Sequence, residues 1–359
     1  MRIIRILNKN QDKGHEMLLS LKHRFLQIAG TISFLCLSSI TYSESINVYS
    51  ARQEGLIKPL LDQFTESSGI QVKLVTGKGD ALLTRLKLEG ANSPADILIT
   101  IDAGRLYRAQ EAGVFQPVSS EKLSNNVPKH LRSKDNLWYG LSMRARTIIY
   151  SKERVSSEEL STYEELANPK WAQRLCIRSS GNIYNQSLVA SLLANNGTVA
   201  TEMWLKGITS NFARKPQGGD RDQVMAVAAG VCDIAVINTY YLGGMLKSSN
   251  ESQQEAAMKV DVFWPNQLGR GAHVNISGAG VTKASQSPEN AKKLLEFLTS
   301  PNSQRWYATI NNEYPVDPKV GASQILKKWG DFKSDSLPVD TLGKLNMEAV
   351  KSMDKAGWP

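Results

Sequence analysis

Apolar segments of two kinds alternate in the first half of the chain. Short β-rich runs lie at 46–49 and 70–75, and the continuous apolar run at 95–100 is typical of a buried strand in a parallel sheet. Between these runs, apolar residues recur at helical spacing over 56–64 and 81–89. The order strand, helix, strand, helix, strand predicts an α/β fold with a parallel sheet.

The second half of the chain repeats this rhythm. Its predicted elements are extended segments at 138–142 and 147–150, a strand at 175–178, helices at 185–195 and 222–229, a strand at 232–237, an extended segment at 272–282 and a helix at 288–299. Two α/β halves joined by extended segments predict two lobes with a cleft between them. Ligands of open α/β sheets bind beyond the carboxyl ends of the strands.

An apolar run near the amino terminus indicates export. Residues 25–40 are mostly apolar, follow a basic stretch at 22–24, and precede the small or hydroxylic residues of a cleavage site at 41–43. This order predicts a secretory signal peptide over residues 1–43. The run is shorter than the roughly 20 residues of a membrane-spanning helix. Met17 is an alternative start, and Cys36 an alternative lipid-attachment site that its bulky preceding residues disfavour.

The charge of the exported chain disfavours nucleic acid as a partner. The whole chain carries +9, and removing the six basic and two acidic residues of the leader leaves +5. This surplus is spread along the sequence without a basic block, and it suits anionic ligands better than nucleic acid. Removing 43 of the 359 residues leaves 316, a length that suggests two domains.

Two cysteines, Cys176 and Cys232, remain after cleavage of the leader. An even pair in an exported chain predicts one disulfide, and adjacent strands bring Cα atoms to about 4.8 Å, within the range that a disulfide accepts. The alternative is a pair of buried thiols.

Three tyrosines follow the two predicted strands. Tyr184 lies eight residues after Cys176, and Tyr240, which is followed by Tyr241, lies eight residues after Cys232. If the two strands are parallel neighbours, the cysteines align at one end and the phenols converge at the other. At a helix start, adjacent side chains diverge by only about 100°, and the positive end of the helix favours a phenolate.

Converging phenols suit a hard, highly charged cation. Tyrosine has a pKa near 10, but a trivalent ion displaces the proton, and three phenolates would neutralise three positive charges. Zinc and copper sites need histidine or cysteine. Of the four histidines, two lie in the leader, and His130 and His273 are isolated. The pattern therefore favours ferric iron, with ordinary aromatic packing as the alternative.

A glycine-rich loop at 216–222 precedes the predicted helix at 222–229. It lacks the lysine and the spacing of a phosphate-binding P-loop. Asp220 or Asp222 is expected to cap the helix, and Gly218 and Gly219 give the turn its freedom.

Several motifs together resemble the periplasmic ferric-ion-binding proteins of ABC importers. They are RSSGNIYNQS at 178–187, ARKPQGGDRDQV at 213–224, CDIAVINTYY at 232–241, and further matches that begin at Val48, Ser93, Gly140, His273 and Asn311. The resemblance covers most of residues 46–318. It implies an α/β, two-lobed type 2 periplasmic-binding-protein fold with an interlobe cleft. The expected lobes are 44–143 plus 276–320 and 144–275, with a C-terminal helical segment, 321–359, packed on them.

The resemblance also implies the ligands of the site. Tyr184, Tyr240 and Tyr241 would hold Fe³⁺ in the cleft. Many relatives carry histidine after the first strand, where this chain has Gln53 and Glu54. Relatives with glutamine there often complete the coordination with carbonate or a similar anion.

By the same resemblance, Gln53 would donate to the anion and Arg144 would pair with it, because an arginine fork suits a bidentate oxyanion. Glu54 is an alternative direct carboxylate ligand. Solvated strand charge is the alternative for Arg144 and Arg146.

The resulting hypothesis is a monomeric carrier protein of the periplasm and not an enzyme. It would deliver ferric iron to an inner-membrane ABC permease with a cytoplasmic ATPase. The alternatives are a binding protein of the same fold for a polyamine, sulfate or phosphonate, an enzyme, and a membrane-tethered sensor. The tyrosine segments lack the acidic companions that a polyamine needs, and no nucleophile elbow or Ser/His/Asp set is present.

Overall fold

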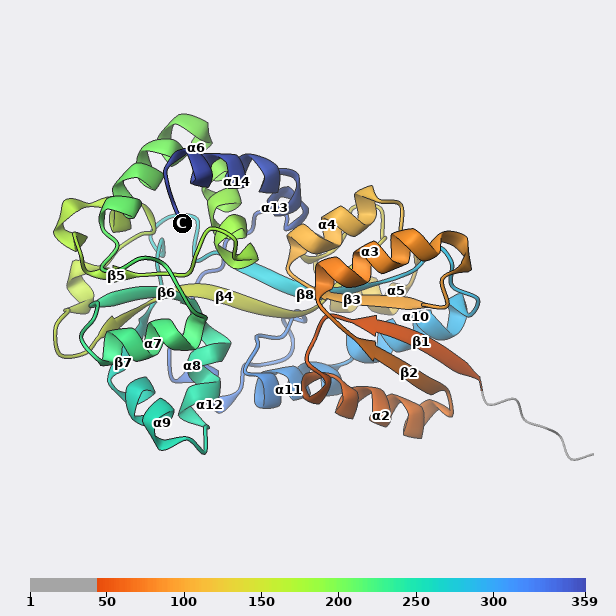
Figure 1. Ribbon diagram of the computed structural model, residues 1–359. Helices are drawn as coiled ribbons and strands as arrows, with labels where there is room; N and C mark the ends of the chain where they lie inside the picture. The colour runs from red at the N-terminus through yellow and green to blue at the C-terminus, as the bar shows by residue number, and fades with distance from the viewer. Residues whose placement is uncertain (1–43) are drawn as a thin grey trace, which may run out of the picture. The chain divides into compact units, whose positions relative to one another are not determined.

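One long strand joins two half-sheets within residues 44–359, the part of the chain that the computed structural model describes. The expected signal peptide lies outside these residues. β4 (Tyr139–Ser151) pairs with β8 (Val274–Val281) over its first half, and with β6 (Ile234–Asn238) and β7 (Val260–Phe263) over its second half. β4 and β8 therefore run between the two groups of elements that Figure 1 shows.

The remaining strands extend this sheet on both sides. They are β1 (Ser45–Ser50), β2 (Gln71–Thr76), β3 (Ile97–Ile101) and β5 (Leu175–Cys176). Among the described residues the order is β2-β1-β3-β8-β4-β6-β5. β1 pairs in parallel with β2 and β3, and β5 pairs in parallel with β6. The prediction of a parallel sheet is confirmed for these pairs. For β4 and β8 the sequence predicted only extended segments, and β4, β7 and β8 make antiparallel pairings.

The continuity of β4 differs from the prediction of two extended segments. Arg144 and Arg146 interrupt the apolar pattern between those segments, yet both are buried and belong to the strand. Their alternative assignment as solvated strand charge is therefore wrong. A buried charge breaks the hydrophobic pattern of a strand without breaking its backbone hydrogen bonds.

Helices cover both half-sheets. They are α2 (Lys58–Ser68), α3 (Gly79–Glu89), α4 (Ala103–Glu111), α5 (Glu121–Asn126), α6 (Ile183–Ser210), α7 (Asp220–Ala228), α8 (Thr239–Leu246), α9 (Glu251–Met258), α10 (Pro288–Leu298), α11 (Pro301–Trp306), α12 (Gln324–Lys327), α13 (Asp340–Lys344) and α14 (Asn346–Lys355). α2 shows why such segments fold: it buries Leu60, Leu61 and Phe64 and ends at Gly69, whose φ of 74° is the left-handed conformation that glycine favours.

α6 is longer than the predicted helix at 185–195. It continues to Ser210 across a kink at Gly197, where φ is 76° and ψ is 171°. The sequence pattern stops at this kink because glycine leaves the helical conformation easily.

The C-terminal segment packs against helices of both halves. α13 contacts α4 and α6, and α14 lies along α6 (Figure 1). The expected lobe boundaries at 143/144 and 275/276 fall inside β4 and β8. Within residues 44–359, every helix is too short or too polar to cross a membrane.

Candidate functional site

Each tyrosine lies in the first turn of a helix that follows one of two neighbouring parallel strands. Tyr184 is the second residue of α6, which follows β5 after a short loop. Tyr240 and Tyr241 are the second and third residues of α8, which follows β6 directly. The tyrosines therefore lie beyond the carboxyl ends of the strands, where open α/β sheets bind their ligands.

The predicted disulfide is confirmed. Cys176 and Cys232 are bonded, with their Cα atoms 5.8 Å apart. The predicted alignment of the cysteines across the sheet is wrong, because Cys176 lies opposite Ala235 and Cys232 precedes β6. The two Cys-to-Tyr spacings are therefore equal in length but different in structure. A loop connects Cys176 to Tyr184, whereas the strand β6 lies between Cys232 and Tyr240.

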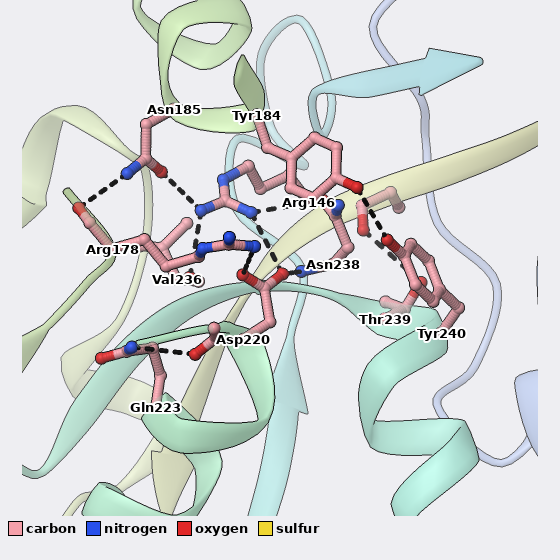
Figure 2. A network of polar contacts seen from close by, with 12 residues as sticks. Arg146, Arg178, Tyr184, Asn185, Asp220, Gln223, Val236, Asn238, Thr239 and Tyr240 are labelled. Atoms are coloured by element: carbon pink, nitrogen blue, oxygen red, sulfur yellow. Dashed lines mark hydrogen bonds and ion pairs between the residues drawn. The ribbon is translucent and has the colours of Figure 1, made fainter. Parts of the chain in front are cut away.

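The structure brings the three phenols together. The hydroxyl of Tyr240 donates to the hydroxyl of Tyr184 at 3.2 Å, and Figure 2 shows these two groups facing each other. The ring centres of Tyr240 and Tyr241 are 4.2 Å apart. All three side chains line one cavity of about 290 Å³.

Two of the residues expected at an anion site share this cavity. Gln53 and Arg144 line it together with the tyrosines. Glu54 does not: its side chain is exposed and lines an adjoining hollow, where Lys78 and Arg105 are its neighbours. Gln53 is exposed as well and also lines this hollow, so the two residues differ in that Gln53 alone of the pair lines the tyrosine cavity.

Arg144 is a buried cation without a complete set of partners. Its Nη2 donates to the carbonyl oxygen of Ile276, and its guanidinium lies 5.3 Å from the ring centre of Tyr184. Its Nε has no hydrogen-bond partner among the described residues. A buried, unpaired guanidinium donor favours an anionic ligand.

Burial keeps the phenols of Tyr240 and Tyr241 protonated when no cation is bound. Burial and the neighbouring phenols of Tyr184 and Tyr241 raise the pKa of Tyr240 well above its ordinary value. Burial, followed by the phenol of Tyr184, raises the pKa of Tyr241 to about 12. A cation that binds these oxygens must therefore displace protons.

The lining of the cavity also includes an ion pair that the sequence pattern did not indicate. Arg52 Nη2 donates to Glu313 Oε2 at 2.7 Å, and the hydroxyl of Ser142 donates to the same oxygen at 2.7 Å. Arg52 and Glu313 are buried and lie 261 residues apart in the chain. Both belong to motifs of the resemblance, but no spacing rule connects them.

Arg221 lies at the rim of the cavity, where its guanidinium is 5.3 Å from the ring centre of Tyr241. In the sequence it belongs to the glycine-rich loop at 216–222, which was not assigned to the site.

The two histidines of residues 44–359 do not line this cavity. Nor do these residues contain a group of three or more His, Cys, Asp or Glu side chains that could hold a metal ion.

Comparisons with known proteins place the chain in a family. The model of the family described as bacterial extracellular solute-binding protein matches residues 92–333. Iron uptake protein A1 of Synechocystis is 51% identical over 315 residues, which are 88% of each chain. The major ferric iron-binding protein of Neisseria meningitidis is 28% identical over 342 residues, 94% of this chain and 98% of the relative.

A solved structure shows the same fold. The FutA protein of Trichodesmium, in complex with iron and citrate ligands, matches with a TM-score of 0.86 and 52% identity over 88% of this chain and 100% of that one. The expected two-lobed type 2 periplasmic-binding-protein fold is therefore confirmed. The chain belongs to the family of bacterial extracellular solute-binding proteins, as a relative of its ferric-iron-binding members.

Proposed function

We propose that this protein binds ferric iron in the periplasm and delivers it to an ABC importer. One observation carries the proposal: three phenols from two helix starts line one cavity together with Arg144, whose Nε has no hydrogen-bond partner among the described residues. Relatives named for iron uptake and for ferric iron binding support the choice of cargo.

The chemistry of the cavity suits Fe³⁺ as cargo. Tyr184, Tyr240 and Tyr241 would each lose a proton and supply one phenolate, which together balance the charge of the ion. The amino ends of α6 and α8 stabilise these negative oxygens. Oxygen ligands also match a hard cation, whereas softer metals prefer sulfur and nitrogen.

An exogenous anion would complete the coordination of the ion. Arg144 and Gln53 are the donors in the cavity that would hold carbonate or a similar oxyanion. The relative from Trichodesmium carries citrate ligands with its iron, which supports a carboxylate-bearing or carbonate-like anion here.

Membership of the family supports delivery to an importer. Its members are the binding components of importers, so an inner-membrane permease with a cytoplasmic ATPase would receive the iron. The protein would act as a monomeric carrier, and its relatives are transport proteins and not enzymes. Protonation of the phenolates, or reduction of the iron, would release the cargo.

A colour test examines the tyrosine site. Ferric citrate added to the purified metal-free protein should produce the visible absorption of phenolate-to-iron charge transfer, and lowering the pH should bleach it as protons compete for the phenolates. The Tyr240→Phe/Tyr241→Phe variant should stay colourless. Tyr107→Phe, on α4 and outside the cavity, is the matched control and should colour like the wild type.

Two results would contradict the proposal. One is a wild-type protein that stays colourless with ferric citrate. The other is colour retained in the double variant.

A further inference from the structure

A single buried carboxylate, Asp220, contacts the segments that carry the tyrosines. Its Oδ2 accepts the backbone N–H of Asn238 at 2.8 Å, directly before α8. Its Oδ1 accepts from Arg178 Nη1 at 3.3 Å, in the loop that leads to α6. Asp220 is fully buried, and Figure 2 shows it between the two segments.

Arg146 of β4 connects the same two segments a second time. Its Nη1 lies 3.4 Å from Asp220 Oδ2 and donates to Asn238 Oδ1 at 3.3 Å. Its Nη2 donates to the side-chain oxygen of Asn185, the neighbour of Tyr184. The amide of Asn185 in turn donates to the carbonyl oxygen of Arg178 at 2.8 Å, so the polar network forms a closed ring beneath the tyrosines.

The ring of Tyr184 rests on the cations of this network. The guanidinium of Arg178 lies 5.6 Å from the ring centre, and that of Arg146 lies 6.0 Å from it. These distances are those of cation–π contacts. Without the carboxylate of Asp220, two guanidiniums would be left without their anionic partner beneath the ring, which strongly disfavours the present arrangement.

Helix capping does not explain Asp220. The N-cap residue of α7 is Gly219, and the side chain that caps it is that of Asp222, whose Oδ2 accepts the backbone N–H of Gly219 at 2.6 Å. Nor is a buried ion pair by itself a source of stability, because the desolvation of the charges offsets their attraction. What remains specific to Asp220 is the geometry: each of its oxygens holds a different tyrosine-bearing segment.

We propose that Asp220 is a positioning residue that sets the placement of Tyr184 against Tyr240 and Tyr241. The proposal rests on the proposed function, because it assigns to Asp220 a control over ferric iron binding without contact to the ion.

Two variants of matched chemistry test this role. Asp220→Asn keeps the shape of the side chain and removes its charge, and Asp222→Asn makes the same change two residues away in the same helix turn. Asp220→Asn should shift or weaken the phenolate-to-iron absorption and lower the ferric affinity at least tenfold in competition with citrate. Asp222→Asn should keep the wild-type absorption and affinity while it lowers the urea midpoint of unfolding.

A metal-free measurement keeps this test separate from that of the proposed function. In protein labelled with ring-¹³C tyrosine, the NMR signals of Tyr184 and Tyr240 are assigned through their phenylalanine variants. These signals should move in Asp220→Asn and stay in place in Asp222→Asn, whether or not the wild type binds iron. A colourless wild type would therefore overturn the proposed function. The positioning role of Asp220 would then be decided by the NMR signals alone.

If Asp220→Asn does not fold, Arg178→Gln replaces it. This variant removes the contact of Arg178 to Asp220 Oδ1 together with its cation–π contact to the ring of Tyr184, and it leaves the more deeply buried Arg146 in place. Because Arg178 contacts the ring of Tyr184 directly, the signal that supports the proposal is a moved signal of Tyr240, which lies on the other segment. Wild-type ring signals, absorption and affinity in the folded variant overturn it.

Discussion

Two pairs of polar residues that lie close together in the sequence occupy different positions in the structure. Gln53 and Glu54 are adjacent and both exposed, yet Gln53 lines the tyrosine cavity, whereas Glu54 begins the turn η1 (Glu54–Leu56) and does not line it. Asp220 and Asp222 separate in the same way, one into the interior and one onto the helix cap. In each pair the sequence shows two polar side chains. The local conformation of the backbone decides which of them lies at the site.

At this scale we predict that Gln53→Ala weakens anion-supported ferric binding about tenfold, as expected for the loss of one hydrogen bond to a charged ligand. Glu54→Gln is the matched control and should leave the affinity unchanged, because Glu54 does not line the tyrosine cavity. Titration with ferric ion in bicarbonate or citrate, followed by the charge-transfer absorption, measures both. A larger loss in Glu54→Gln than in Gln53→Ala would show that Glu54 is the ligand.

Two strand–helix units carry the candidate site. β5 leads to α6 and β6 leads to α8, and the disulfide joins the strand β5 to the turn before β6. The sequence predicted both units because their apolar strands are short and continuous. The predicted register of the two strands, with Cys176 opposite Cys232, was wrong. A loop whose shape the sequence does not reveal separates Tyr184 from β5, whereas Tyr240 follows β6 directly.

At the element scale, removing the disulfide should destabilise the folded chain. Cys176 and Cys232 are 56 residues apart, and a closed loop of this length restricts the unfolded chain by about 4 kcal/mol. We expect Cys176→Ala/Cys232→Ala to lower the free energy of unfolding by about 2–4 kcal/mol, measured in urea. Wild-type protein unfolded in a reducing buffer is the control and should show a similar loss. An unchanged urea midpoint in both would contradict this account.

The crossing of β4 and β8 organises the molecule as a whole. It joins the half-sheets, brings Arg144 and Arg146 into the interior, and buries His273 beside them. The backbone N–H of Arg146 donates to the carbonyl oxygen of His273 at 3.0 Å. Burial, followed by the charges of Arg146, Arg270 and Arg144, lowers the pKa of His273 to about 3.

This environment predicts a pH dependence of global stability. The pKa of His273 in the folded chain lies below the value of about 6.5 in the unfolded chain, so the unfolded chain takes up the proton first as the pH falls. Stability is therefore lost between about pH 6.5 and pH 3. In His273→Asn, the free energy of unfolding should fall less steeply in this window, by about 1.4 kcal/mol per pH unit.

Urea unfolding at a series of pH values measures this difference. His130→Asn is the comparison and should flatten the profile less, because burial alone lowers the pKa of the half-buried His130. Parallel profiles for the wild type and His273→Asn would contradict the assignment.

The sequence by itself determined the α/β order of elements, the disulfide pairing and the three tyrosines at helix starts. These features follow from local periodicity and from short spacings, which act through neighbouring backbone. Only the tertiary structure decided the continuity of β4, the pairing of Arg52 with Glu313 and the burial of Asp220 between two arginines. Such pairings join residues far apart in the chain, and a charged side chain carries no local sign of the partner that makes its burial possible.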